Sequence, residues 1–283
     1  MGFNFNMNFI TPDAPIGIFD SGIGGLTVAQ AISNLLPYEQ FVYFGDTAHL
    51  PYGDKSPQAI ARYSVRIAHF LKKKGCKIVV IACNTASAWA YKQVQEALGK
   101  DFLVLNVVDP AVDYVCSTFA KYSRMGVIAT KATVNSGIYR ESFKKINPKI
   151  KLNSISTPLL APMIEEGYFN NKISQTIINN YLDNHRLLGI EALILACTHY
   201  PLILPEVQKY YKSKNVEIIN PATCVARATK AVLAQHNLLQ TNVCVPHHSF
   251  FVSDYTEGFE AATKIFFNQK VDLQHYPIWE TAE

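Results

Sequence analysis

Short, continuously apolar runs alternate with amphipathic stretches along the first hundred residues of this chain. The apolar runs are PIGIFD, FVYFGD and KIVVIAC, and the stretches LTVAQAISNLL and AIARYSVRIAHFLKKKG separate them. Strands that are apolar on both faces and separated by helices are typical of a parallel sheet that is covered on both sides. The pattern therefore predicts an α/β fold.

The same order of elements occurs a second time. An apolar RMGVIAT is followed by a helical VNSGIYRESFKKI, a short KLNSIS, a helical SQTIINNYLDNHRLLG and an apolar EALILAC. Gly17 and Cys83 of the first set correspond to Gly126 and Cys197 of the second, with a few inserted residues. A repeat of this kind predicts two pseudo-symmetric α/β domains with mainly parallel sheets.

Two breaks in the pattern, at Asp109-Pro110 and Asn220-Pro221, suggest the domain boundaries. We expect the final SFFVSDYTEGFEAATKIFF to return to the first domain. The first domain is therefore predicted to comprise residues 15–108 and 220–283, and the second domain residues 109–219.

Composition narrows the classes of function. The 283 residues are 49% hydrophobic, which is enough for a globular core, and the net charge is only +4. The one dense basic run, Lys72-Lys73-Lys74 with Lys77, is interpreted as a solvated helix end, so no nucleic-acid partner is expected. No apolar run reaches the roughly 18 residues of a membrane span, and the N-terminus does not resemble a secretory signal. The six cysteines form no CxxC pair, so we expect no disulfide framework, no metal site and a reducing cytoplasmic location.

Polar residues follow four of the predicted strands. They are Asp20-Ser21, the loop at 46–53 (DTAHLPYG), Cys83-Asn84-Thr85 and Cys197-Thr198-His199. In open parallel sheets, ligands bind beyond the carboxyl ends of the strands. If the two domains face each other, these ends converge on one cleft, and each domain contributes one cysteine.

Each of these cysteines directly precedes a predicted helix. The positive end of a helix dipole lowers the pKa of a nearby thiol, which favours the reactive thiolate. Asn84 and Thr85 are expected to cap the helix that continues to Leu98. A single cysteine at a strand end is commonly buried and inert, and we interpret the other four, at positions 76, 116, 224 and 244, in that way. The repetition is what favours reactivity at Cys83 and Cys197.

Two facing thiols indicate acid–base chemistry at a carbon atom. Inversion of a stereocentre needs a base on one face and an acid on the other, and a thiolate and a thiol can perform both roles. Asp20 could assist one cysteine and His199 the other, although an ordinary capping or hydrogen-bonding role is the alternative for each. Donors for substrate carboxylates are Ser21, Thr85, Thr130, Thr133, Thr198 and the backbone around Tyr52-Gly53.

Four segments closely resemble those of bacterial glutamate racemases, in order and over residues 15 to about 265. They are GIFDSGIGGLTV, YFGDTAHLPYGDKS, ACNTASA and LACTHYPL. The resemblance implies cofactor-independent interconversion of L- and D-glutamate, supplying D-glutamate for peptidoglycan. It further implies a homodimer, with the active site between the two domains. The N-terminal arm, residues 1–14, has no counterpart in the family and is predicted to be disordered.

The resemblance also implies a role for individual residues. Cys83 and Cys197 match the acid–base pair, Asp20 and His199 match their assistants, and Glu165 matches a carboxylate that supports the histidine. The matching substrate contacts are Asp20, Ser21, Tyr52, Gly53, Asn84, Thr85, Thr130, Thr133, Thr198 and His199. Ala129 stands where many members have glycine.

Two alternatives belong to other classes of protein. A dinucleotide-binding oxidoreductase is suggested by Gly22, Gly24 and Gly25, which follow a strand and open a helix. Against it, Thr27 occupies the third glycine position, and Asp20 would place a carboxylate beside a pyrophosphate. A two-domain binding protein without catalysis would share the cleft but leave the paired cysteines unexplained.

Overall fold

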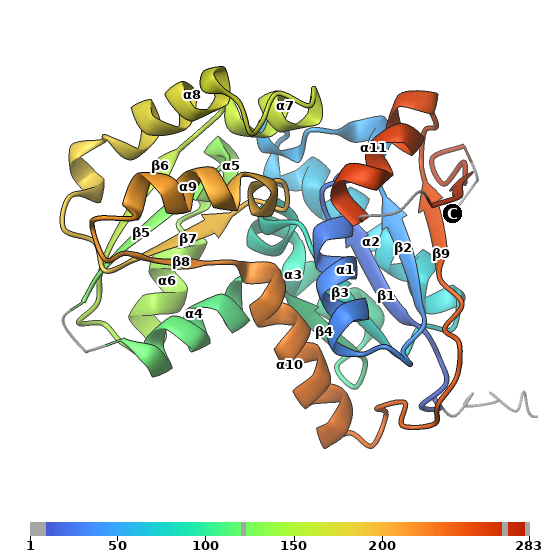
Figure 1. The fold of residues 1–283 in the computed structure, drawn as a ribbon. Helices are drawn as coiled ribbons and strands as arrows, with labels where there is room; N and C mark the ends of the chain where they lie inside the picture. The colour runs from blue at the N-terminus through green and yellow to red at the C-terminus, as the bar shows by residue number, and fades with distance from the viewer. Residues whose placement is uncertain (1–9, 120–122, 268–270, 281–283) are drawn as a thin grey trace, which may run out of the picture.

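The computed structural model describes residues 10–119, 123–267 and 271–280, in which ten strands form two parallel sheets (Figure 1). The first sheet has the strand order β10-β9-β2-β1-β3-β4, and the second has the order β6-β5-β7-β8. The strands are β1 (Ile16–Asp20), β2 (Phe41–Gly45), β3 (Ile78–Ile81), β4 (Leu103–Asn106), β5 (Arg124–Ala129), β6 (Lys151–Ser156), β7 (Ala192–Ala196), β8 (Glu217–Ile219), β9 (Ser249–Val252) and β10 (Leu273–His275).

The two sheets repeat one topology. In the first, β1 lies between β2 and β3 with β4 beyond, and in the second, β5 lies between β6 and β7 with β8 beyond. The strands β1 and β7 are buried along their whole length, as continuously apolar runs require. The predicted fold class, two similar α/β units with parallel sheets, is confirmed.

Helices cover the faces of the sheets. They are α1 (Leu26–Leu35), α2 (Pro57–Lys73), α3 (Asn84–Leu98), α4 (Val108–Thr118), α5 (Lys131–Ser136), α6 (Ile138–Ile146), α7 (Leu160–Glu165), α8 (Lys172–Leu182), α9 (Leu204–Tyr211), α10 (Pro221–Gln235) and α11 (Glu257–Phe267). Short 3-10 turns occur at Thr47–His49, Tyr52–Asp54, His185–Leu187 and Tyr200–Ile203. No helix in the described ranges is both long and apolar enough to cross a membrane.

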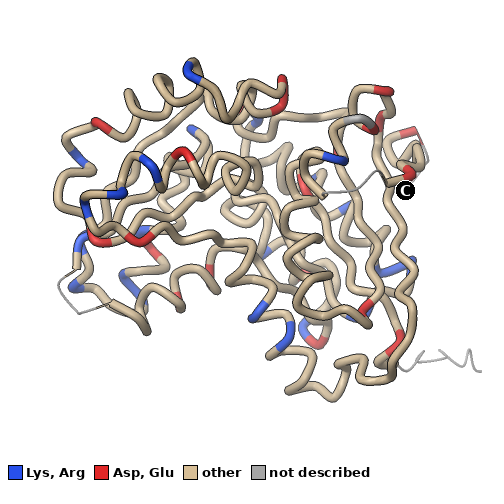
Figure 2. The backbone as a smooth tube through the Cα atoms, viewed as in Figure 1, with Lys and Arg blue, Asp and Glu red and all other residues tan. Residues whose placement is uncertain are grey.

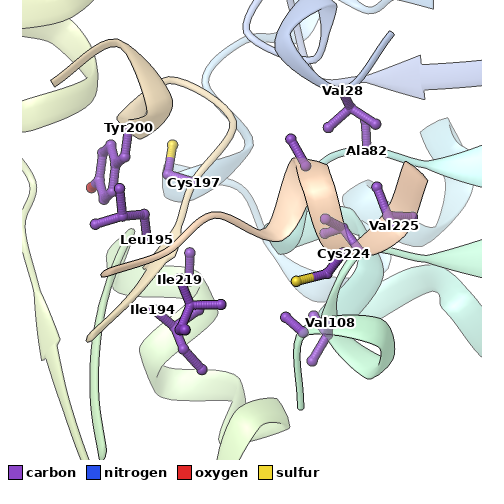
Figure 3. Close-up of a cluster of buried hydrophobic side chains, with 14 of the residues drawn as sticks. Val28, Ala82, Val108, Ile194, Leu195, Cys197, Tyr200, Ile219, Cys224 and Val225 are labelled. Carbon is purple, nitrogen blue, oxygen red and sulfur yellow. The ribbon is translucent and has the colours of Figure 1, made fainter. Parts of the chain in front are cut away.

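One hydrophobic cluster joins the two halves. It contains Val28 of α1 and Val225 of α10 together with Ile194 of β7 and Ile219 of β8. Figure 3 labels all four, and draws Ile194 and Ile219 side by side. The opposite face of the first sheet packs on α2 and α3 through a separate cluster that includes Phe19. The shared cluster removes apolar surface of both halves from water, which fixes one half against the other.

The last two strands belong to the first sheet. Strand β9 pairs in parallel with β2, and β10 pairs with β9. Between the sheets, α10 packs on both α1 and α4 (Figure 1). We therefore propose the division into residues 15–108 with 220–283, and residues 109–219.

Two local features differ from the sequence-based expectations. The predicted helix VNSGIYRESFKKI is divided by Gly137, whose φ of +69° ends α5 before α6 begins. Of the predicted disordered arm, residues 1–9 lie outside the described residues. The carbonyls of Pro12 and Asp13 accept hydrogen bonds from Lys77 and Gln40, so the disorder predicted for the arm does not extend to them.

Charged residues of both signs are interspersed along the chain (Figure 2). The basic run ends α2, as predicted, but the expectation that it is solvated is wrong for Lys77. Lys77 is fully buried, and its Nζ lies 2.6 Å from Oε2 of Glu39.

Two other lysines of the run also make contacts within the molecule. Lys72 Nζ donates to the Leu98 carbonyl at 2.6 Å, and Lys74 Nζ lies 4.6 Å from the centre of the Phe251 ring. These contacts give the run a structural role at the helix end.

Candidate active site

A cavity of about 40 Å³ lies where the carboxyl ends of the two sheets meet. Both Cys83, which follows β3, and Cys197, which follows β7, line it. The other predicted site residues in its wall are Ser21, Tyr52, Gly53, Asn84, Thr85, Thr130, Glu165, Thr198 and His199. The structure therefore brings together strand ends that are more than a hundred residues apart in the sequence.

Two predicted residues, Asp20 and Thr133, lie behind this wall. Asp20 is fully buried at the end of β1, and Thr133 is buried in α5. The wall also contains Gly22, Leu50, Pro51, Ala161 and Ala196, which were not predicted as site residues from the sequence. Leu50 and Pro51 belong to the loop 46–53, but apolar side chains carry no chemical signal in a sequence.

Cys83 caps helix α3 through its own side chain. Its Sγ accepts a hydrogen bond from the Ala86 amide at 3.4 Å and lies 3.6 Å from the Ser21 hydroxyl. The expectation that Asn84 and Thr85 cap this helix is wrong, because both already belong to its first turn. Because neither side chain caps the helix, both can contact a ligand in the cavity.

The environment of Cys83 also reverses the expected pKa shift. Burial, followed by the negative charge of Asp20, raises the pKa of the Cys83 thiol to about 12. The hydrogen bonds from Ala86 and to Ser21 lower the pKa, but by less. Cys83 does lie at a helix N-terminus, as predicted, and this position lowers the pKa of its thiol. In a fully enclosed site, desolvation raises the pKa by more.

Cys197 lies beside a histidine and a carboxylate. Its Sγ is 3.6 Å from Nδ1 of His199, and Nε2 of His199 is 2.9 Å from Oε1 of Glu165. The approach of Glu165 is off the direction of the ring N–H, so the contact is an ion pair rather than a straight hydrogen bond. Burial alone would lower the pKa of His199, but Cys197 and Glu165 together raise it well above the ordinary value. The imidazolium is thus the favoured form.

Asp20 is held by the turn that opens α1. Its Oδ2 accepts hydrogen bonds from the amides of Gly22 at 3.1 Å and Gly25 at 3.0 Å, and Oδ1 lies 3.3 Å from the Thr198 hydroxyl. Burial raises the pKa of this carboxyl, while the nearby His199 and the two amides oppose the rise. Asp20 therefore acts on Cys83 through its charge from a position behind the cavity wall.

The glycines after β1 are explained by close packing. A Cβ at Gly24 would lie 2.5 Å from Cε1 of His199, and a Cβ at Gly25 would lie 2.4 Å from Cβ of Asp20. The space in front of this turn is thus filled by the second half of the protein. A pyrophosphate would need that space, and it would need the backbone amides that the Asp20 carboxylate already occupies. The dinucleotide-binding alternative therefore does not fit the structure.

Three threonine hydroxyls meet across the boundary between the halves. Oγ1 of Thr85 in α3 is 3.0 Å from Oγ1 of Thr130 and 3.0 Å from Oγ1 of Thr133, and these last two are 3.0 Å apart. Thr130 also caps α5 by accepting from the Thr133 amide. Thr133 was predicted to contact the substrate, but it lies behind the cavity and supports the two threonines in the wall.

Comparisons with known proteins agree with this architecture. A profile of the Asp/Glu/Hydantoin racemase family matches residues 25–229. A glutamate racemase of Geobacter metallireducens is 39% identical over 248 residues, which are 88% of this chain and 90% of the relative. A glutamate racemase of Neisseria meningitidis serogroup C is 36% identical over 266 residues, which are 94% of this chain and 97% of the relative.

A solved structure gives the same result. The glutamate racemase of Francisella tularensis, crystallised in complex with D-glutamate, superposes with a TM-score of 0.86 at 35% identity. The superposition covers 94% of this chain and 98% of the other. The profile, the relatives and the shared two-sheet architecture lead to one conclusion: this chain is an enzyme of the Asp/Glu/hydantoin racemase family.

Proposed function

We propose that the protein interconverts L- and D-glutamate without a cofactor, with Cys83 and Cys197 acting on opposite faces of the α-carbon. The observation that carries the proposal is the placement of these two cysteines, one from each sheet, in the wall of a single cavity. Glutamate is the substrate named for the curated relatives and bound in the Francisella structure. Asn84 and the hydroxyls of Ser21, Thr85, Thr130 and Thr198 are the proposed partners of its polar groups.

The electrostatics support a defined starting state. An imidazolium at His199 stabilises negative charge on the Cys197 sulfur, while burial keeps the proton on Cys83. From this state the Cys197 thiolate removes the α-proton, and the C–H electron pair remains on the α-carbon. Cys83 then delivers its proton to the opposite face, which leaves Cys83 as the thiolate and Cys197 as the thiol. The reverse reaction uses the same groups with their roles exchanged.

The proposal extends to the biological setting. We propose that the enzyme supplies D-glutamate for peptidoglycan, that it acts in the cytoplasm, and that it is a homodimer, as is usual for the family. Light scattering of the purified protein should give twice the mass of one chain. A mass equal to one chain would contradict the dimer without affecting the catalytic proposal.

The activity is tested with purified protein and no added cofactor. In deuterated water, D-glutamate should lose its circular dichroism. Its α-proton should exchange for deuterium, so the α-proton signal in the NMR spectrum should disappear. Persistence of both signals would overturn the proposal and favour a binding protein that has the cleft without the catalysis.

The roles of the two cysteines are tested separately. Cys83→Ser and Cys197→Ser should each reduce kcat for racemisation by at least about 10²-fold, the usual contribution of a positioned acid or base. Cys224→Ser is the matched control, because Cys224 is buried in α10 and does not line the cavity that contains Cys83 and Cys197. Near-native turnover in either Cys83→Ser or Cys197→Ser would refute the two-base assignment.

A further inference from the structure

A buried tyrosine from the second half contacts a side chain in the cavity wall of the first. Oη of Tyr139, the second residue of α6, lies 2.7 Å from Oδ1 of Asn84, the first residue of α3. Both residues are 3% exposed. The contact becomes reachable because Gly137 ends α5 in a left-handed conformation and lets α6 begin in a new direction.

The chemistry of the hydroxyl decides which way the carboxamide faces. A buried phenol keeps its proton, since burial raises the pKa of Tyr139, and a buried O–H requires an acceptor. Asn84 Oδ1 supplies that acceptor at 2.7 Å. If the amide were turned around, its NH₂ would point at the phenol oxygen, and the hydroxyl proton would lose the acceptor that Oδ1 provides.

The orientation has a direct consequence for the cavity, whose wall includes Asn84. With Oδ1 bound to Tyr139, the NH₂ group of Asn84 is left as a donor on the cavity side. A donor attracts a carboxylate, whereas the opposite orientation would present a carbonyl oxygen that repels it.

We propose that Tyr139 is a positioning residue for the substrate site, which holds the Asn84 carboxamide with its NH₂ group toward a substrate carboxylate. The inference rests on the proposed racemisation of glutamate. Tyr139 acts through Asn84 and takes no part in proton transfer, so it affects binding of the substrate more than the chemical step.

The first test compares two tyrosine-to-phenylalanine variants. Tyr139→Phe frees the carboxamide to turn. KM for D-glutamate should then rise by roughly tenfold, because the substrate loses about one hydrogen bond between a neutral donor and its charged carboxylate. The value of kcat should change less than about threefold. Tyr211→Phe is the control: Tyr211 is a buried tyrosine of α9 whose hydroxyl has no hydrogen-bond partner among the described residues. Its KM should equal that of the unmodified enzyme.

A double-mutant cycle separates positioning from a general structural role. In an Asn84→Ala background, Tyr139→Phe should change KM no further, because the side chain that it orients is absent. If Tyr139→Phe raised KM equally in both backgrounds, or left KM unchanged in the unmodified enzyme, the proposal would be wrong.

A second variant does not depend on how well Tyr139→Phe folds. Asn84→Asp keeps an acceptor for Tyr139 but presents a carboxylate oxygen to the cavity, and KM should rise at least as much as in Tyr139→Phe. An unchanged KM in Asn84→Asp would overturn the donor role. Failure of the proposed function is distinguishable from all these outcomes, because then the unmodified enzyme itself would not racemise glutamate.

Discussion

At the scale of single residues, the two cysteines have unlike surroundings despite their equivalent positions after β3 and β7. Cys83 lies beside Ser21 and near the Asp20 charge, whereas Cys197 lies beside His199, which contacts Glu165. The pseudo-symmetry of the backbone therefore does not extend to electrostatics. One thiol is held protonated and the other faces a cation, which is the difference on which the proposed two-base reaction depends.

The first prediction concerns the charge of His199. Because the pKa of His199 in the folded protein is raised, the stabilisation from its protonated form is fully present below the ordinary value of 6.5 and is lost as pH rises through the folded pKa. Glu165→Gln removes one cause of the rise. NMR titration should then show a lower pKa for His199, and the alkaline limb of kcat/KM should move to lower pH.

Glu166→Gln is the control for this prediction, because Glu166 is the adjacent, exposed carboxylate at the end of α7. It should leave the titration of His199 unchanged. An identical titration in Glu165→Gln and in the unmodified protein would refute the role assigned to Glu165.

At the scale of elements, the turn between β1 and α1 is a contact surface for the second half. Thr27 of α1 donates to the carbonyl of Thr198 at 2.9 Å, and Gly24 faces the His199 ring. The glycine-rich sequence is thus needed for close approach of two strand-end loops. A glycine-rich turn after a strand is shared with nucleotide-binding folds, and only the packing partner tells the two uses apart.

Substitution of Gly24 tests this packing. Gly24→Ala places a methyl group 2.5 Å from Cε1 of His199, whose ring is held by Cys197 and Glu165. We expect a loss of about 1–3 kcal/mol in the free energy of unfolding, the usual cost of overpacking, and a larger relative loss of kcat. Urea unfolding and racemisation assays measure the two effects.

The control for the stability change is Gly22→Ala, because a Cβ there would meet its nearest atom, in Leu50, at 3.6 Å, an ordinary contact. Its free energy of unfolding should fall by less than that of Gly24→Ala. Equal losses in both variants would contradict the close-packing explanation.

At the scale of the whole molecule, the end of the chain supports one wall of the site. Asp46 is fully buried and accepts hydrogen bonds from Tyr52 at 2.7 Å, Ser253 at 2.7 Å and Trp279 Nε1 at 2.9 Å. Tyr52 is in the cavity wall, and Trp279 is near the C-terminus. The C-terminal segment therefore stabilises the loop 46–53.

The two tryptophans of the chain give a matched test of this contact. Trp279→Phe removes a donor to a buried carboxylate and should lower the free energy of unfolding by about 1.5–3 kcal/mol. Trp89→Phe removes a bond to the Ala132 carbonyl at 3.3 Å, and that neutral bond should cost only about 0.5–1.5 kcal/mol. Urea unfolding compares them, and an equal or smaller loss in Trp279→Phe would contradict the role of Asp46.

Much of the fold and the site was predictable because the signals are local. The apolar runs predicted strands, and the structure buries these strands on both faces. The polar residues that follow the runs make up most of the cavity wall. Tyr139 was missed because its partner, Asn84, is 55 positions away in the sequence. Thr133 was misplaced because its side chain meets Thr85 only once the halves have packed.

The sequence by itself determined the α/β class, the internal repeat and the residue types at the strand ends, because hydrophobic periodicity and turn chemistry act over a few neighbouring residues. Only the tertiary structure decided the charges of those residues. Desolvation and Coulomb interactions depend on distances between segments far apart in the chain, so burial raises the pKa of Cys83 to about 12 where its helix alone favoured a lower one. The same dependence on packing determines which neighbour each cysteine has.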